Sequence, residues 1–128
     1  MSSGYGSNYA DVIEEDAIRK FCPKEYKNLL KEIKKSDITF EDFAQMVACD
    51  DLSDDDKGMS DALEALMNAF ETKTGLGLEL GYHDSEDNGD KYDDISGAYW
   101  NVDGMFQLTP EGKKMDKYVN RKFFVTFG

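Results

Sequence analysis

The sequence is poor in the residues that build disulfide frameworks and histidine-based metal sites. Its 128 residues include only two cysteines, one histidine and two prolines. Two cysteines cannot form the framework that staples small secreted domains, so we interpret Cys22 and Cys49 as reduced, buried thiols. A single histidine excludes zinc sites that are built from several histidines.

Long apolar runs are also missing. No stretch approaches the ~20 apolar residues that a helix needs to cross a bilayer. The first residues, Met1 to Gly4, lack the basic and then apolar pattern of a secretory signal. We therefore expect a cytoplasmic protein that does not act in a membrane.

Basic residues are in the minority, with 15 Lys and Arg against 27 Asp and Glu and a net charge of -12. Binding to nucleic acid or to anionic lipid needs clustered basic side chains, so neither partner is expected. Within the first half of the chain, the stretch 18–35 is locally basic and holds seven basic and two acidic residues. This stretch could bind an acidic partner, and the alternative is that its lysines form a solvated helix face.

What the sequence contains is typical of a folded domain. Hydrophobic residues make up 40% of the chain and aromatic residues 12%, which is enough apolar material for one core in a chain of this length. Residues 1–8 are rich in Ser and Gly, and we expect a frayed N-terminus there. Residues 9–128 are expected to form a single α+β domain.

The first half of the chain has helical periodicity. Apolar residues recur at spacings of three and four in four successive segments. The expected helices run from a cap at Asp11 to before Pro23, over about 23–35, from a capping box at Thr39 through Val47, and from the acidic run 50–56 to Gly75.

After Gly75 the apolar period changes to two, which is typical of strands. We predict strands over 76–82, 95–102, 105–108 and 123–127, with a turn at Asp103-Gly104 and a short helix from Thr109 through about Val119. The predicted fold is α+β. About four N-terminal helices pack on a C-terminal antiparallel sheet of three to four strands, with one short helix before the last strand.

The densest polar constellation is the acidic segment 83–94. Its oxygen atoms suit hard cations such as Ca²⁺ or Mg²⁺. The candidate metal ligands are Asp84, Glu86, Asn88 and Asp90. Ile95 stands at the twelfth place, where an EF-hand loop needs a bidentate Glu. The alternative is a solvated hairpin loop whose charges protect strand edges. We predict no cofactor, and Ca²⁺ or Mg²⁺ are the ions that this segment would hold if it is a site.

Two further groups of residues could belong to a site. His83 is the candidate general base, and the alternative is a structural or surface histidine. Tyr92, Tyr99 and Trp100 are candidates for a binding pocket, because aromatic residues are enriched in such sites, and the alternative is core packing of the sheet.

The leading functional hypothesis is a non-catalytic cytoplasmic module for protein interaction or regulation. It depends on the absence of a recognisable nucleophile and base pair and on the segregation of basic and acidic segments. The alternative hypothesis is a metal-dependent, hydrolase-like enzyme that uses the 83–94 segment.

Overall fold

The computed structural model describes residues 5–83, 97–104 and 109–127, and side chains only within 11–83, 97–104 and 109–120. The helices are α1 (Glu15–Phe21), α2 (Pro23–Lys35), α3 (Phe40–Ala48), α4 (Lys57–Thr74) and α5 (Pro110–Lys113), with 3₁₀ segments η1 (Asp54–Asp56) and η4 (Asp116–Tyr118). The strands are β1 (Tyr5–Ile13), β2 (Gly77–His83), β3 (Gly97–Asp103) and β4 (Val119–Phe127). The predicted α+β class, with its N-terminal helices and antiparallel sheet, is confirmed.

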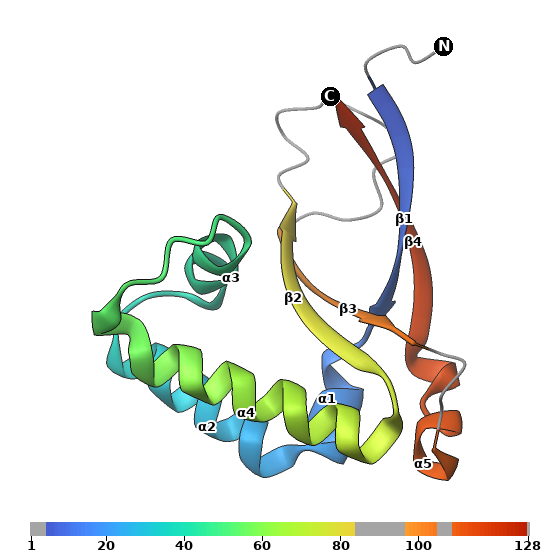
Figure 1. Cartoon of the computed structure of the whole chain (residues 1–128), viewed down its shortest axis with the longest axis horizontal. Helices are drawn as coiled ribbons and strands as arrows, with labels where there is room; N and C mark the ends of the chain where they lie inside the picture. The colour runs from blue at the N-terminus through green and yellow to red at the C-terminus, as the bar shows by residue number, and fades with distance from the viewer. Residues whose placement is uncertain (1–4, 84–96, 105–108, 128) are drawn as a thin grey trace.

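The sheet has the order β2-β3-β1-β4, and all neighbouring strands are antiparallel. β1 pairs with β4 along its whole length, from Tyr5 opposite Phe127 to Ile13 opposite Val119. It meets β3 only through its last two residues. The first half of β1 and the end of β4 therefore form a ribbon that extends away from the helices (Figure 1).

β1 is the element that the sequence prediction gets wrong. We predicted fraying over 1–8, of which residues 1–4 lie outside the described residues, and a helix from Asp11. Tyr5–Ile13 is instead a strand, and α1 begins only at Glu15. The backbone of Glu14 donates to the Tyr118 carbonyl oxygen at 3.2 Å, which ties the end of β1 to the start of β4. The partner strands come much later in the chain, and local periodicity does not register such distant pairing.

The helix boundaries that depend on local signals are confirmed. Pro23 occupies the first turn of α2, where its missing N–H costs nothing. Thr39 Oγ1 accepts from the Asp42 backbone N–H at 3.0 Å, and Asp42 Oδ2 accepts from the Thr39 N–H at 3.3 Å. Gly75 ends α4 in the left-handed region at φ 79°, which glycine adopts without a steric penalty.

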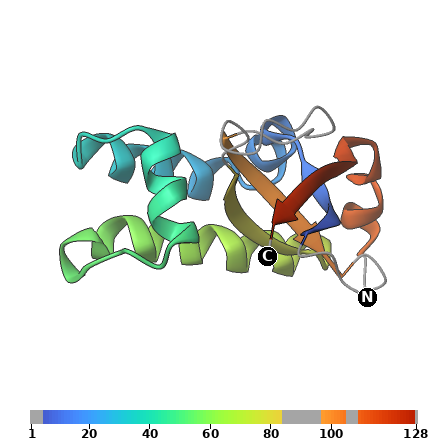
Figure 2. The same cartoon turned by 90° about the horizontal axis from the view of Figure 1, so that it is seen from above.

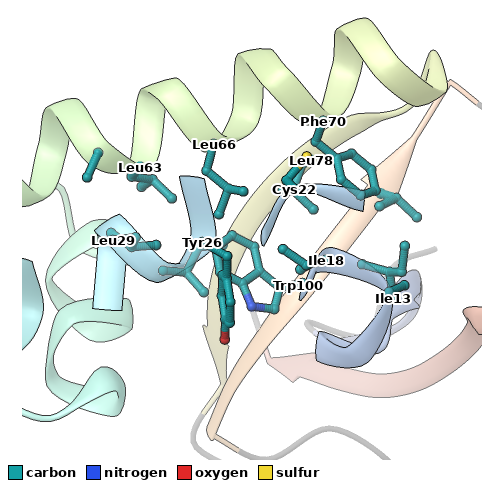
Figure 3. Close-up of a cluster of buried hydrophobic side chains, with 14 of the residues drawn as sticks. Ile13, Ile18, Cys22, Tyr26, Leu29, Leu63, Leu66, Phe70, Leu78 and Trp100 are labelled. Atoms are coloured by element: carbon teal, nitrogen blue, oxygen red, sulfur yellow. The ribbon is translucent and has the colours of Figure 1, made fainter. Parts of the chain in front are cut away.

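The hydrophobic core lies where the helices meet the sheet. α2 and α4 lie side by side, and α3 packs against β2 and β3 (Figures 1 and 2). The buried side chains drawn in Figure 3 come from both layers, and those labelled are Ile13, Ile18, Cys22, Tyr26, Leu29, Leu63, Leu66, Phe70, Leu78 and Trp100. One continuous apolar cluster therefore joins α1, α2 and α4 to β2 and β3.

The segment after β3 agrees with the sequence in part. Gly104 has a φ of 76°, as a turn at Asp103-Gly104 requires, whereas the predicted strand 105–108 lies outside the described residues. Thr109 caps a short helix as predicted, and its Oγ1 accepts from the Gly112 N–H at 3.0 Å. That helix ends at Lys113 rather than near Val119, where β4 already begins.

Candidate functional site

The strongest candidate for a site is a groove along the outer surface of α1 and α2. It has a volume of about 280 Å³ and is lined by Arg19, Pro23, Tyr26, Lys27 and Leu30. We call it the basic groove. Its walls are mostly carbon, and its two charged residues are both basic.

Helical spacing explains why these residues meet. Pro23 lies three and four residues before Tyr26 and Lys27, and Leu30 lies four and three residues after them, so the four lie on neighbouring positions of the α2 surface. Arg19 belongs to the last turn of α1. Cys22 is both the C-cap of α1 and the N-cap of α2, so no further residue separates the two helices. The short connection therefore brings Arg19 over the first turns of α2.

A hydrogen-bonded and ionic assembly fixes one end of the basic groove. The Tyr26 hydroxyl donates to Glu15 Oε2 at 2.5 Å. Glu15 Oε1 pairs with Arg19 Nη2 at 2.9 Å, and the Arg19 guanidinium lies 5.6 Å from the centre of the Tyr26 ring. The Arg19 guanidinium and the Tyr26 ring thus form a cation–π pair. The Glu15 carboxylate contacts both members of this pair.

Tyr26 keeps its proton in this assembly. Burial of the phenol raises its pKa above the ordinary value, and the hydrogen bond to the Glu15 carboxylate raises it further, while the Arg19 charge acts in the opposite direction. The Tyr26 ring is also part of the core, because it packs edge-on against Trp100 at 6.3 Å between ring centres. Figure 3 shows its hydroxyl pointing away from α4. The floor of the basic groove is therefore a rigid core residue.

The basic groove continues into the lysine face of α2. Lys24, Lys27, Lys31, Lys34 and Lys35 are all exposed. Lys35 pairs with Glu32 at 3.3 Å, and the other four form no ion pair with residues in the described ranges. Their charges are available to a partner.

A second hollow is lined by residues of the opposite charge. It measures about 320 Å³ between α4 and the paired ends of β2 and β3. Its lining residues are Met67, Asn68, Glu71, Gly77, Leu78, Glu79, Asn101 and Asp103. We call it the acidic hollow. Its three carboxylates are exposed and, within the described part of the chain, form no ion pair.

Of the predicted acidic site, only His83 lies within the described residues. His83 is half-buried at the end of β2, opposite Gly97 of β3. The predicted metal ligands Asp84, Glu86, Asn88 and Asp90, together with Tyr92, lie outside the described residues. Among residues 5–83, 97–104 and 109–127, no group of three His, Cys, Asp or Glu could hold a metal ion. The metal hypothesis stays a prediction.

Tyr99 and Trp100 do not form one pocket, because neighbouring strand residues face opposite sides of a sheet. Trp100 is buried against Tyr26 and Phe40, as the core-packing alternative predicts. Its indole Nε1 has no hydrogen-bond partner among the described residues. Tyr99 is half-buried over Gly81 of β2, and burial, with a smaller effect of Glu79, raises the pKa of its phenol.

The two cysteines differ. Cys22 is fully buried, as predicted, and burial raises the pKa of its thiol. Cys49 is exposed, so the prediction that both are buried is wrong. Cys49 directly follows the last residue of α3, as its C-cap.

The sequence indicated the lysines of the site but not the groove. Tyr26 and Leu30 were interpreted only as part of the buried face of a helix. The signal that could have found the assembly is the spacing of Glu15 and Arg19, four residues apart on one short helix. Their joint contact with Tyr26, eleven residues after Glu15, depends on how α1 packs on α2.

Comparison with protein families, curated proteins and solved structures finds no significant match to this chain. In the part of the chain that the structure describes, no helix is long and apolar enough to cross a membrane. The geometry and charge of the two hollows are therefore the basis for a functional proposal.

Proposed function

We propose that the chain is a non-catalytic interaction module that binds an acidic protein segment on the outer face of α1 and α2. The observation that supports this proposal is the basic groove, which combines an apolar floor with Arg19 and Lys27 and opens onto the lysine face of α2. An apolar hollow that includes an aromatic ring and an arginine has a composition typical of recognition surfaces.

Charge complementarity supports an acidic partner. The chain carries a net charge of -12, so its field repels an acidic protein over most of its surface. The lysine face of α2 is one local exception. Such segregation orients an encounter, because attraction at one face and repulsion elsewhere disfavour wrong approaches.

A protein segment fits this surface better than a membrane or a nucleic acid. A membrane-binding helix inserts its apolar face, but Tyr26, Leu29 and Ile33 of α2 are buried in the core. A nucleic-acid site needs many phosphate contacts, whereas the floor of the basic groove is apolar. The groove also lacks a Ser, Cys, His or carboxylate among its lining residues, which supports binding rather than catalysis.

The test is selection from a display library of short random peptides. Peptides are selected on the wild-type chain and on the double variant Lys27→Glu/Lys31→Glu. We expect enrichment of Asp and Glu around one large apolar residue, and a loss of about tenfold or more in affinity for the double variant, since two attractive contacts become repulsive.

The matched control is Lys113→Glu/Lys114→Glu, which makes the same change in net charge at exposed positions of the α5 region. The control should retain the selected peptides. Equal loss in both variants would show that only net charge matters, and absence of acidic enrichment would overturn the proposal.

A further inference from the structure

We infer that Arg19 is the specificity-determining residue of the basic groove, and that the bound segment carries a carboxylate directly beside a large apolar side chain. This inference rests on the proposed function and names the chemistry of the partner. It is carried by the contacts that hold the Arg19 side chain, by the apolar floor next to it and by the charge of the surrounding face.

The Arg19 guanidinium is oriented although its side chain is 55% exposed. Glu15 contacts its Nη2, and its Cζ lies over the Tyr26 ring, 5.6 Å from the ring centre. Glu15 is itself fixed by the Tyr26 hydroxyl. A flexible surface arginine loses side-chain entropy when it binds a ligand, whereas a guanidinium that is already held in place loses less.

Glu15 leaves part of the guanidinium free. Arg has five N–H donors in a planar fork, and a carboxylate contact at Nη2 does not use all of them. The remaining donors can take a second carboxylate, for which the bidentate geometry of arginine is well suited. Lys27, by contrast, forms no ion pair within the described ranges. It therefore adds positive charge to the groove, but no contact in these ranges orients its ammonium group.

The apolar part of the ligand is set by Pro23, Tyr26 and Leu30, which form the floor beside Arg19. Pockets for whole drug-sized ligands have volumes of roughly 300–1,000 Å³. The basic groove, at about 280 Å³, is slightly smaller than that range and is open, so it suits a single side chain. A Leu or Phe beside a Glu or Asp has both features that the groove requires.

The experiment uses three short peptides in a Gly/Ser background. The first carries Glu-Leu-Glu at its centre, the second replaces Leu by Ser, and the third replaces the central Glu residues by Gln. Binding is measured by fluorescence anisotropy at low and at physiological salt. Arg19→Lys keeps the charge but removes the planar fork, and Lys27→Arg is the matched exchange in the other direction.

We expect Arg19→Lys to weaken the first peptide about tenfold, because a charge-assisted bidentate contact is lost. Lys27→Arg should change the affinity for the first peptide by less than about threefold, because an exposed ion pair contributes little. The second and third peptides should bind weakly and be insensitive to Arg19→Lys. Octanoate, which joins a carboxylate to an apolar chain, should bind far more weakly than the first peptide.

Glu15→Ala separates positioning from charge. Removing a carboxylate beside a basic groove should tighten an acidic peptide if only net charge matters. If Glu15 orients Arg19, binding should weaken several-fold instead. Circular dichroism and thermal melting of each variant show that the fold is retained.

Failure of this inference differs from failure of the proposed function. Equal effects of Arg19→Lys and Lys27→Arg, or tighter binding by Glu15→Ala, overturn the role of Arg19 while salt-dependent peptide binding still supports the interaction module. If octanoate binds as well as the peptide, the ligand is not a protein segment. If no acidic peptide binds at any salt concentration, both proposals are wrong.

Discussion

The basic groove and the acidic hollow differ in what a ligand would displace on entering them. The acidic hollow is the larger, at about 320 Å³ against about 280 Å³ for the basic groove. Its carboxylates, Glu71, Glu79 and Asp103, are exposed and hydrated. A cation that enters it must remove that water and gains attraction that salt screens. The basic groove offers an apolar floor, whose dehydration is favourable.

The hollows also differ in how firmly their charged groups are held. Arg19 pairs with Glu15 and lies over the Tyr26 ring. Asp103 lies at the exposed end of β3, and its carboxylate covers Gly77 without an ion pair in the described ranges. Volume alone would favour the acidic hollow. Selectivity depends on oriented charge beside apolar surface, and only the basic groove combines them.

The largest expected effect comes from removing the floor of the basic groove. Tyr26 is 1% exposed and packs on Trp100, so Tyr26→Ala should destabilise the fold by about 3–5 kcal/mol, as for other large aromatic truncations in a core. Met67, at the acidic hollow, is only half-buried, and Met67→Ala should cost about 1–2 kcal/mol. Urea denaturation measures both. Equal losses of unfolding free energy would show that Tyr26 and Met67 contribute equally to the stability of the fold.

Alkaline titration gives the next largest effect. The raised pKa of Tyr26 means that the folded state keeps this proton when the unfolded chain releases it near pH 10. The stabilisation is present below that pH and is lost as the pH rises through the folded-state pKa. Tyr26→Phe should cost about 1.5 kcal/mol at neutral pH, because a hydrogen bond to a carboxylate is lost.

The difference between Tyr26→Phe and the wild-type chain should then shrink above pH ~10, as Tyr26 ionises. Tyr99 also has a raised pKa, but it is present in both proteins and its contribution cancels. The measurement is the free energy of unfolding against pH for the two chains. A difference that stays constant to the alkaline end would contradict the raised pKa of Tyr26 in the folded state.

The elements that could be predicted from the sequence are those with local causes. Pro23 at the start of α2, the Thr39–Asp42 capping box and Gly75 after α4 each act within a turn of the residue concerned. β1 could not be predicted, because Tyr5–Ile13 is stabilised by β4, at the other end of the chain. The same Val12 and Ile13 fit either a helix or a strand until that partner is known.

The candidate site follows the same rule. The lysine face depends on spacing within one helix and was visible in the sequence. The groove depends on α1 turning back over α2, which places Glu15 and Arg19 on Tyr26. Trp100 was a candidate for a binding pocket from its residue type alone, and its place beneath Tyr26 makes it a core residue instead.

The smallest expected effect tests whether the exposed Asp103 carboxylate at the acidic hollow can rotate freely. A Cβ at Gly77 would lie 2.5 Å from Asp103 Oδ1, but Asp103 is exposed and can rotate away. Gly77→Ala should therefore change the free energy of unfolding by less than about 1 kcal/mol. Alanine lowers the backbone entropy of the unfolded chain, and this stabilisation offsets the cost of displacing the carboxylate.

The matched control for this substitution is Gly97→Ala. Gly97 has a φ of 79°, and a Cβ there would meet Glu41 Oε2 at 2.7 Å. The Glu41 carboxylate already accepts from the Ala98 N–H at 2.8 Å, so it cannot move without losing that bond. Gly97→Ala should cost about 1–2 kcal/mol or more. If Gly77→Ala costs as much, the Asp103 carboxylate is held in place, and the contrast between a fixed Arg19 and a movable acidic wall no longer holds.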